Sequence, residues 1–268
     1  MISRCISIGK PEEGCLNEDA VLAKDNMLAV SDGAGGGGLY AERRSRYLLD
    51  HLPAIPICTL EDLDNWIESI WEPFYNLCEE DAKKQGGMFL NKFYDEGSFA
   101  TLAVAWKLSD NIYKYLIYGD SVVFHYNKET DVLEHSFTTL KDFCLPPYLI
   151  NCKDEIKSEG CRYGEFNTCS GSIIFVCTDA LAHYILMMYD VSHDDKREEL
   201  LAALSAHSKN ENYIRTALAL RNVDFYNDVL CKLISSSKNS ANFRSHIARL
   251  SRDSLIALDD YSFCFQID

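Results

Sequence analysis

Acidic residues stand at the ends of apolar, strand-like runs in five separate parts of this chain. The five motifs are Asn17-Glu18-Asp19, Ser31-Asp32-Gly33, Tyr118-Gly119-Asp120-Ser121, Thr178-Asp179-Ala180 and Leu258-Asp259-Asp260-Tyr261-Ser262. Carboxylate and carbonyl oxygens are the ligands that hard divalent cations such as Mg²⁺ and Mn²⁺ prefer. The pattern therefore favours a sheet fold that gathers acids from distant parts of the chain around a divalent-cation site.

A predicted hairpin brings the first two motifs together. Residues 20–23 and 27–31 are strand-like, and an Asp-Asn pair between them favours a turn. Asp19 and Asp32 are equidistant from this turn, so the hairpin would place them opposite each other. Their like charges would then repel, which a bound cation or solvent screening of exposed side chains would relieve.

A second hairpin is predicted around the Asp-Asn pair that follows residues 101–108. Residues 112–118 form its other arm, with aromatic and apolar residues alternating with polar ones at the period of a half-buried strand. Folding over at this turn would place Thr101 beside Asp120. Two hairpins that deliver acids by the same device support the cation site better than one.

Charge and cysteine content exclude several classes of protein. The 268 residues carry a net charge of −15 with a pI near 4.9, which argues against nucleic acid as a partner, because phosphate backbones bind Lys- and Arg-rich surfaces. No basic-then-apolar leader or membrane-length apolar run is present, so no membrane association is expected. The eleven scattered cysteines contain no C-x-x-C pair and indicate reduced thiols in a cytoplasmic protein.

The order of expected elements predicts an α+β fold. Strands are expected over residues 2–8, 20–31, 98–108, 112–126, 132–137, 172–177, 254–258 and 261–267, with an irregular stretch from 145 to 169. Helices are expected over residues 39–52, 60–85 and 181–188, and over much of 195–250. With no repeat or low-complexity linker, the chain is predicted to form a single domain over residues 1–268.

A glycine run offers a competing interpretation. Residues 33–38 match G-x-G-x-x-G between a strand and a helix, as in a dinucleotide-binding oxidoreductase. However, Asp32 directly before the first glycine would repel a pyrophosphate, and no parallel strand ending in an acid follows at the required distance. A turn in which glycines let the backbone approach a cation and a phosphate accounts for the run better.

The ordered set of motifs resembles the metal-dependent protein phosphatases of type 2C, the PPM family. The matching segments are Glu18-Asp19, Asp32-Gly33-Ala34-Gly35-Gly36, Gly97-Ser98-Phe99-Ala100-Thr101, Gly119-Asp120-Ser121, Thr178-Asp179-Ala180 and Asp259-Asp260-Tyr261-Ser262. The resemblance runs in the family's order along nearly the whole chain. It implies an antiparallel β-sandwich flanked by helices on both sides, and hydrolysis of phosphoserine or phosphothreonine in a protein substrate that a Ser/Thr kinase has phosphorylated.

The same resemblance implies a role for each acid. Asp32 would bridge two Mn²⁺ or Mg²⁺ ions, the Gly33 carbonyl would complete one ion, and Asp179 with Asp259 would complete the other. The implied catalytic residues are thus Asp32, Asp179 and Asp259. Glu18 and Asp19 would hold metal-bound waters, and Asp120 would bind a weaker third ion.

Departures from the family pattern leave an alternative open. The family's phosphate-binding arginine falls on Gly14, and Lys10 or Arg4 is the candidate replacement, although either could be an ordinary surface charge. Ala34 stands where the family's most studied member has a histidine; His183, one helical turn after Asp179, could face the site or simply pack. The alternative is a pseudophosphatase, a regulatory binding module that keeps the fold with little turnover.

Overall fold

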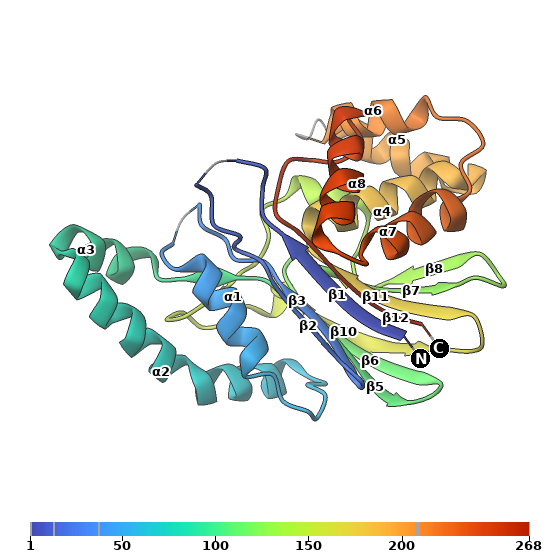
Figure 1. Cartoon of the computed structure of the whole chain (residues 1–268). Coiled ribbons are helices and arrows are strands. Elements are labelled where there is room, and N and C mark those ends of the chain that lie inside the picture. Colours follow the sequence, from blue (N-terminus) through green and yellow to red (C-terminus); the bar gives the residue numbers. More distant parts are fainter. Residues whose placement is uncertain (1, 13, 37, 207–209, 268) are drawn as a thin grey trace.

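Two antiparallel sheets packed face to face form the centre of the molecule, and helices cover the outer face of each (Figure 1). The computed structural model describes residues 2–12, 14–36, 38–206 and 210–267. This is the predicted α+β sandwich with helices on both sides. The two termini lie beside each other, because the first and last strands are paired.

Each main sheet has five strands. The first sheet has the order β1 (Ile2–Ile8), β12 (Tyr261–Ile267), β11 (Ser172–Cys177), β7 (Val122–Asn127) and β8 (Val132–His135). The second sheet has the order β10 (Cys161–Asn167), β6 (Ile112–Tyr118), β5 (Leu102–Ser109), β3 (Met27–Ser31) and β2 (Ala20–Lys24). A short ladder joins β4 (Phe99–Ala100) to β9 (Ile150–Asn151).

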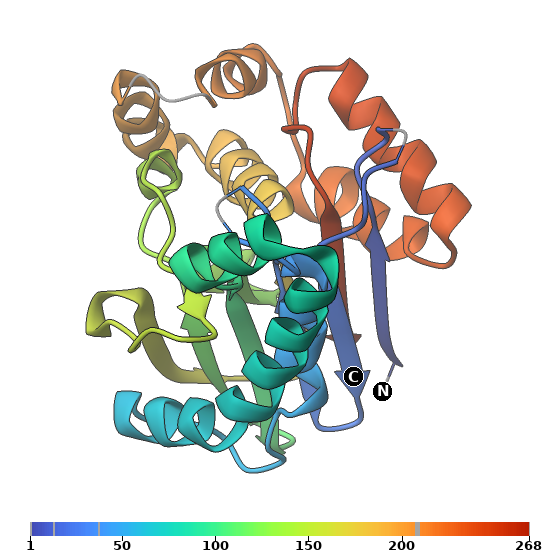
Figure 2. The same cartoon turned by 90° about the vertical axis from the view of Figure 1, so that its left-hand side faces the viewer.

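The helices divide between the two outer faces, as the two views show (Figure 1, Figure 2). On the side of the second sheet lie α1 (Ala41–Asp50), α2 (Leu60–Gln85) and α3 (Gly87–Glu96). On the side of the first sheet lie α4 (Asp179–Ser192), α5 (Arg197–Ser205), α6 (Glu211–Leu218), α7 (Cys231–Ser236) and α8 (Ser240–Arg252). A π-helical turn (Phe225–Leu230) and 3₁₀ turns at Leu140–Cys144, Ser158–Gly160 and Asp194–Lys196 complete the set.

The apolar core has layers because side chains alternate along each strand. In β3, Leu28 and Val30 pack between the two sheets, whereas the residues on either side face α1 and α2. In β11, Ile174 and Val176 likewise enter the space between the sheets, and Phe175 packs under the α4–α8 layer. Both faces of these central strands are therefore buried, as a sandwich covered by helices requires.

Strand β3 also decides against the dinucleotide-binding alternative. It leads into the glycine run and α1, but it pairs antiparallel with both of its neighbours, β2 and β5. A dinucleotide-binding fingerprint needs a parallel βαβ unit. The oxidoreductase interpretation is therefore wrong.

Two expectations about local structure are wrong. Residues 145–169 are not irregular throughout, since β9 and β10 lie within them, and β10 pairs with β6 along seven residues. Only Phe166 of β10 is buried, so this edge strand has no apolar alternation to reveal it. Residues 254–258 form a turn and loop, not a strand, in which Leu255 and Ile256 are buried against the α4–α8 layer.

Two expected strands are each divided in the structure. The run 98–108 separates into β4 and β5, and the run 112–126 separates into β6 and β7. Gly119, at φ +100°, lies at the second break, where the chain leaves one sheet for the other.

In the part of the chain that the structure describes, no helix combines the length and apolarity needed to span a bilayer.

Candidate metal centre

A pocket of about 760 Å³ lies where the strand ends and connecting loops of the two sheets meet. The predicted site residues that line it are Lys10, Glu18, Asp32, Gly33, Asp120, Asp179 and Asp259. The structure thus brings together residues from five separate segments. Asp19 is the one predicted site residue outside this lining; it is buried directly behind it, close enough for its charge to act on Asp32.

The β2–β3 hairpin positions Asp19 and Asp32. Ala20 pairs with Ser31, so the next residue on each strand, Asp19 and Asp32, face each other as the sequence predicts. The backbone of Asp32 is fixed twice: its N–H donates to Thr101 Oγ1 (3.1 Å), and its carbonyl accepts from Thr101 N–H (2.8 Å). The hairpin and the β4–β5 junction therefore hold Asp32 from both sides.

The position of Thr101 differs slightly from the prediction. A β-bulge between Lys107 and Ser109 shifts the β5–β6 register by one residue, so that Leu102 pairs with Tyr118. Thr101 consequently faces Gly119 rather than Asp120, and a Cβ added to Gly119 would lie 2.9 Å from Thr101 Cγ2. Asp120 and Thr101 still line the same pocket.

Asp19 is a buried carboxyl with one oxygen satisfied. Thr178 Oγ1 donates to its Oδ2 (3.0 Å), whereas its Oδ1 is buried without a hydrogen-bond partner. Burial raises the pKa of Asp19 to about 8, and the charges of Asp260 and Asp179 add to the increase against the opposing hydrogen bond of Thr178.

Asp32 is the electrostatic centre of the pocket. Removal from water is the main cause that raises its pKa well above the usual range. The charges of four further carboxylates raise it in the same direction: Asp19, Asp179, Asp120 and Asp259. Four acids from other segments of the chain thus act on Asp32.

Helix α4 presents Asp179 in its first turn, where the positive end of the helix dipole favours a carboxylate.

The glycine loop on the other side of the pocket is crowded by backbone and by Glu18. A Cβ on Gly33 would collide with the carbonyl oxygens of Ala41 and Glu18, and one on Gly35 would collide with the Glu18 carboxylate. These glycines let the loop approach Glu18 closely.

Lys10 contacts an acid rather than open solvent. Its Nζ lies 3.0 Å from Asp259 Oδ1, and both side chains are about one-third exposed. Desolvation alone would lower the pKa of Lys10, but the hydrogen bond and charge of Asp259, with the charges of Asp260 and Glu18, outweigh it and raise that pKa. Gly14, which replaces the family arginine, lies exposed outside the pocket at φ +84°.

Asp260 has a positioning role that the sequence analysis did not identify. Its Oδ1 accepts the backbone N–H of Lys10 (2.8 Å) and its Oδ2 accepts that of Glu18 (2.7 Å). One buried carboxylate therefore ties both ends of the 10–18 loop to the start of β12. The sequence placed Asp260 within a motif, but its partners lie about 250 positions away along the chain.

Several further residues complete the pocket. Phe143, Pro146, Pro147 and Leu149 form an apolar wall, and His183 lines the pocket with its ring edge-on to Phe143 (5.5 Å between centroids). The Pro-Pro pair marked only an irregular segment in the sequence. His183 is therefore both packed and facing the pocket, the two alternatives that the sequence left open.

The donor set is suited to a hard divalent cation. It consists of carboxylate oxygens with backbone carbonyls nearby, and the unpartnered buried Oδ1 of Asp19 is a site that a metal-bound water could satisfy. Within residues 2–12, 14–36, 38–206 and 210–267, no three His, Cys, Asp or Glu side chains form a ready-made ligand cluster. The acids share a pocket without closing into a complete coordination sphere.

This sandwich, with acids gathered at one end, has the fold of the serine/threonine protein phosphatases, which confirms the resemblance to type 2C phosphatases at the level of the fold. The catalytic domain of PstP in complex with two manganese ions matches with a TM-score of 0.52 and 15% identity, over 99% of both chains. The Mycobacterium tuberculosis phosphatase PstP/Ppp matches with a TM-score of 0.55 and 15% identity, over 100% of this chain and 98% of that one.

A third match is the serine/threonine phosphatase Stp1 from Staphylococcus aureus, with a TM-score of 0.53 and 12% identity over 100% of this chain and 96% of Stp1. No protein-family profile and no curated protein sequence matches the chain. Since the identities are low, the similarity lies in the fold.

Proposed function

We propose that this protein is a metal-dependent phosphatase that hydrolyses phosphoserine or phosphothreonine in proteins. The observation that carries the proposal is that the fold brings Asp32, Asp120, Asp179 and Asp259 around one pocket, with Asp19 buried behind it. The fold similarity to PstP in complex with two manganese ions supports the same chemistry. The substrate would be a cytoplasmic protein that a Ser/Thr kinase phosphorylates.

In this proposal Asp32, Gly33, Asp179 and Asp259 hold two Mn²⁺ or Mg²⁺ ions. Glu18 and Asp19 hold water beside them, and Asp120 binds a weaker third ion. Such ions, when bound, lower the pKa of a water and neutralise charge on a phosphoryl group, so no protein nucleophile is needed.

The chain's own groups would bind and orient the phosphorylated segment. The phosphate would lie beside Gly36, where an added Cβ would meet nothing within 4 Å, and the wall with Phe143, Pro146 and Pro147 would face the rest of the segment. If Asp259 holds a divalent cation, the Lys10 ammonium, which lines the same pocket, would be released to contact the substrate phosphate.

The direct test is hydrolysis of a phosphothreonine peptide and of an aryl phosphate in Mn²⁺, Mg²⁺ and EDTA. We expect turnover in Mn²⁺ or Mg²⁺ and none above background in EDTA. Asp32→Asn should abolish turnover, whereas Glu72→Gln, an exposed change on α2 away from the pocket, should not. Equal turnover in EDTA and in Mn²⁺ would overturn the proposal.

One observation favours the second candidate, a pseudophosphatase that binds partners without turnover. The Lys10 ammonium already neutralises Asp259, a predicted ligand, with a cation that belongs to the chain. A protein that binds phosphothreonine peptide but hydrolyses it in no divalent cation would support this candidate instead.

A further inference from the structure

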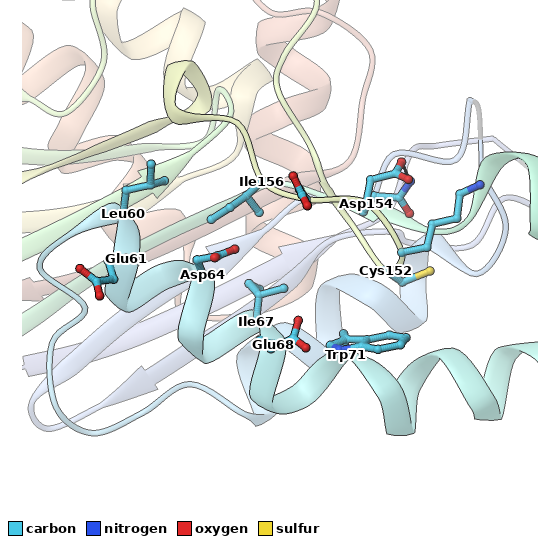
Figure 3. Close-up of a pocket in the computed structure, with 12 residues that line it drawn as sticks. Leu60, Glu61, Asp64, Ile67, Glu68, Trp71, Cys152, Asp154 and Ile156 are labelled. Atoms are coloured by element: carbon cyan, nitrogen blue, oxygen red, sulfur yellow. Dashed lines mark hydrogen bonds between the residues drawn. The ribbon is translucent and has the colours of Figure 1, made fainter.

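A second cleft, of about 520 Å³, lies between α2 and residues 151–156 and shares no lining residue with the acidic pocket. Figure 3 shows Asp64 and Ile67 projecting from the helix toward this segment, and Ile156 projecting back toward the helix. The cleft is open to solvent along a face of α2 that no other helix covers in Figure 2.

The helix contributes two parallel stripes to the cleft. Acids recur at Glu61, Asp64 and Glu68, and apolar residues recur at Leu60, Ile67 and Trp71. Spacings of three, four and seven residues keep each stripe on one side of a helix. All three acids are exposed, whereas Ile67 is buried and the other two apolar residues are half-buried.

The opposite wall of the cleft also combines apolar residues with exposed acids. Cys152 and Ile156 extend the apolar floor, and Asp154 and Glu155 are exposed at its rim. The one basic residue in the lining, Lys153, directs its Nζ to the carbonyl oxygens of Tyr94 and Asp95 at 2.5 and 2.7 Å. Within the described residues, Glu61, Asp64, Glu68 and Glu155 form no ion pair with the chain itself.

Asn151 anchors the start of the 151–156 wall. Its side chain donates to the carbonyl of Glu96 (3.2 Å) and accepts the N–H of Ser98 (3.3 Å), and its own carbonyl accepts Arg44 Nη2 (3.1 Å). Asn151 also pairs with Phe99 in the β4–β9 ladder. This end of the cleft is therefore fixed before a ligand binds, which lowers the ordering cost of binding there.

We propose that this cleft binds a basic amphipathic helix of a partner protein. An apolar ridge on the partner would pack on Ile67, Trp71 and Ile156, and arginine or lysine side chains on both sides of the ridge would pair with the acidic rims. Five exposed carboxylates around an apolar floor select for that charge pattern and reject an acidic one. Leu60 and Trp71 are separated by about 16 Å along α2, which suits roughly three turns of a partner helix.

The probe is a labelled peptide of about four helical turns, with leucine at every third or fourth position and arginine beside each leucine. Binding to the whole protein is measured by fluorescence anisotropy, which does not depend on turnover. We expect saturable binding that weakens as salt rises. A peptide with glutamate in place of each arginine, and one with serine in place of each leucine, should not bind.

Charge reversal locates the interaction. Asp64→Lys with Glu68→Lys should weaken the Kd by about tenfold or more, since it replaces two attractions by two repulsions. Glu80→Lys with Glu129→Lys makes the same change in net charge at exposed positions outside the cleft and should leave the Kd within about twofold. The isosteric pair Asp64→Asn and Glu68→Gln should give an intermediate loss, and circular dichroism checks that each variant is folded.

The proposal is overturned if the arginine–leucine peptide does not bind. It is also overturned if the cleft variant and the control variant weaken binding equally, because the peptide would then respond to net charge alone. Equal binding of the serine-substituted peptide would show that the apolar floor is not used.

Discussion

At the scale of single residues, the predicted metal ligand Asp259 already forms an ion pair with a cation of the chain, Lys10. The ammonium and a divalent cation would compete for the same carboxylate oxygen. Because the ion pair is partly exposed, it is worth only about 0.2–1 kcal/mol. A divalent cation at Asp259 would therefore displace the Lys10 ammonium at small cost, and Lys10 is itself a lining residue of the pocket.

We therefore predict two opposite effects of Lys10→Met. Removal of the competing ammonium should tighten divalent-cation binding by about 1.5- to 5-fold, measured by calorimetry. If Lys10 then contacts the substrate phosphate, the same change should raise the KM for a phosphothreonine peptide. Lys24→Met, an exposed change at the end of β2, is the control and should alter neither quantity. An unchanged cation affinity would show that the ion pair does not restrain Asp259.

At the scale of structural elements, the loop from Lys10 to Glu18 depends on the start of β12. The carboxylate of Asp260 accepts one backbone N–H from each end of the loop. The loop carries Lys10 and leads directly to Glu18 and Asp19, so Asp260 positions three predicted site residues without lining the pocket itself.

The variant Asp260→Asn tests these two hydrogen bonds. The amide can accept only one of the two N–H groups and presents its own N–H₂ to the other, so we expect a loss of about 1–3 kcal/mol in the free energy of unfolding. Hydrogen exchange at the Glu18 amide should also become faster. Asp253→Asn, an exposed change after α8, should affect neither measurement. If both variants unfold at the same denaturant concentration, the two hydrogen bonds of the Asp260 carboxylate do not contribute to the free energy of unfolding.

The same scale shows what the sequence could predict. The β2–β3 hairpin follows from two apolar runs around an Asp-Asn turn, and the long helix α2 follows from its apolar stripe. In the structure the side chain of Thr59 also accepts the N–H of Asp62 and caps this helix. These signals are local. Strand β10 and the role of Asp260 depend on partners far away in sequence, and the bulge in β5 shifted Thr101 by one position.

In the candidate site, too, the sequence predicted what depends on local signals and missed what depends on contacts between distant residues. The sequence indicated which acids stand at strand ends, and the fold brings them around one pocket, with Asp19 behind it. It could not indicate that Lys10 pairs with Asp259, because that contact depends on how the first loop meets the last strand. The assignment of each acid to a particular metal ion stays a prediction.

At the scale of the whole molecule, the acidic centre couples stability to pH. The pKa of Asp19 is about 8 in the folded protein, above its ordinary value of 3.8. Between these values the native state holds a proton that the unfolded state releases, so this group stabilises the fold at low pH. Its contribution is lost as pH rises toward 8, and Asp32 acts in the same direction.

We predict that in EDTA the melting temperature falls between pH 5 and pH 8 by more than it does in Asp19→Asn. One unit of pKa corresponds to about 1.4 kcal/mol, and each kcal/mol shifts the melting temperature of a protein of this size by about 2–4 °C. Mn²⁺ should reverse the fall, because it binds the ionised carboxylates of the native state. If the melting temperatures of the two proteins fall equally between pH 5 and pH 8, the pKa of Asp19 is not raised in the folded protein.

The most direct test of the central claim, that these acids form a divalent-cation site, is a calorimetric titration of Mn²⁺ into the unmodified protein and into Asp32→Asn. We predict saturable binding to the unmodified protein and loss of most of it in the variant, since the charges of Asp19, Asp120, Asp179 and Asp259 all act on Asp32. Glu72→Gln should bind as the unmodified protein does. No measurable binding to the unmodified protein, or equal binding to Asp32→Asn, would contradict the account.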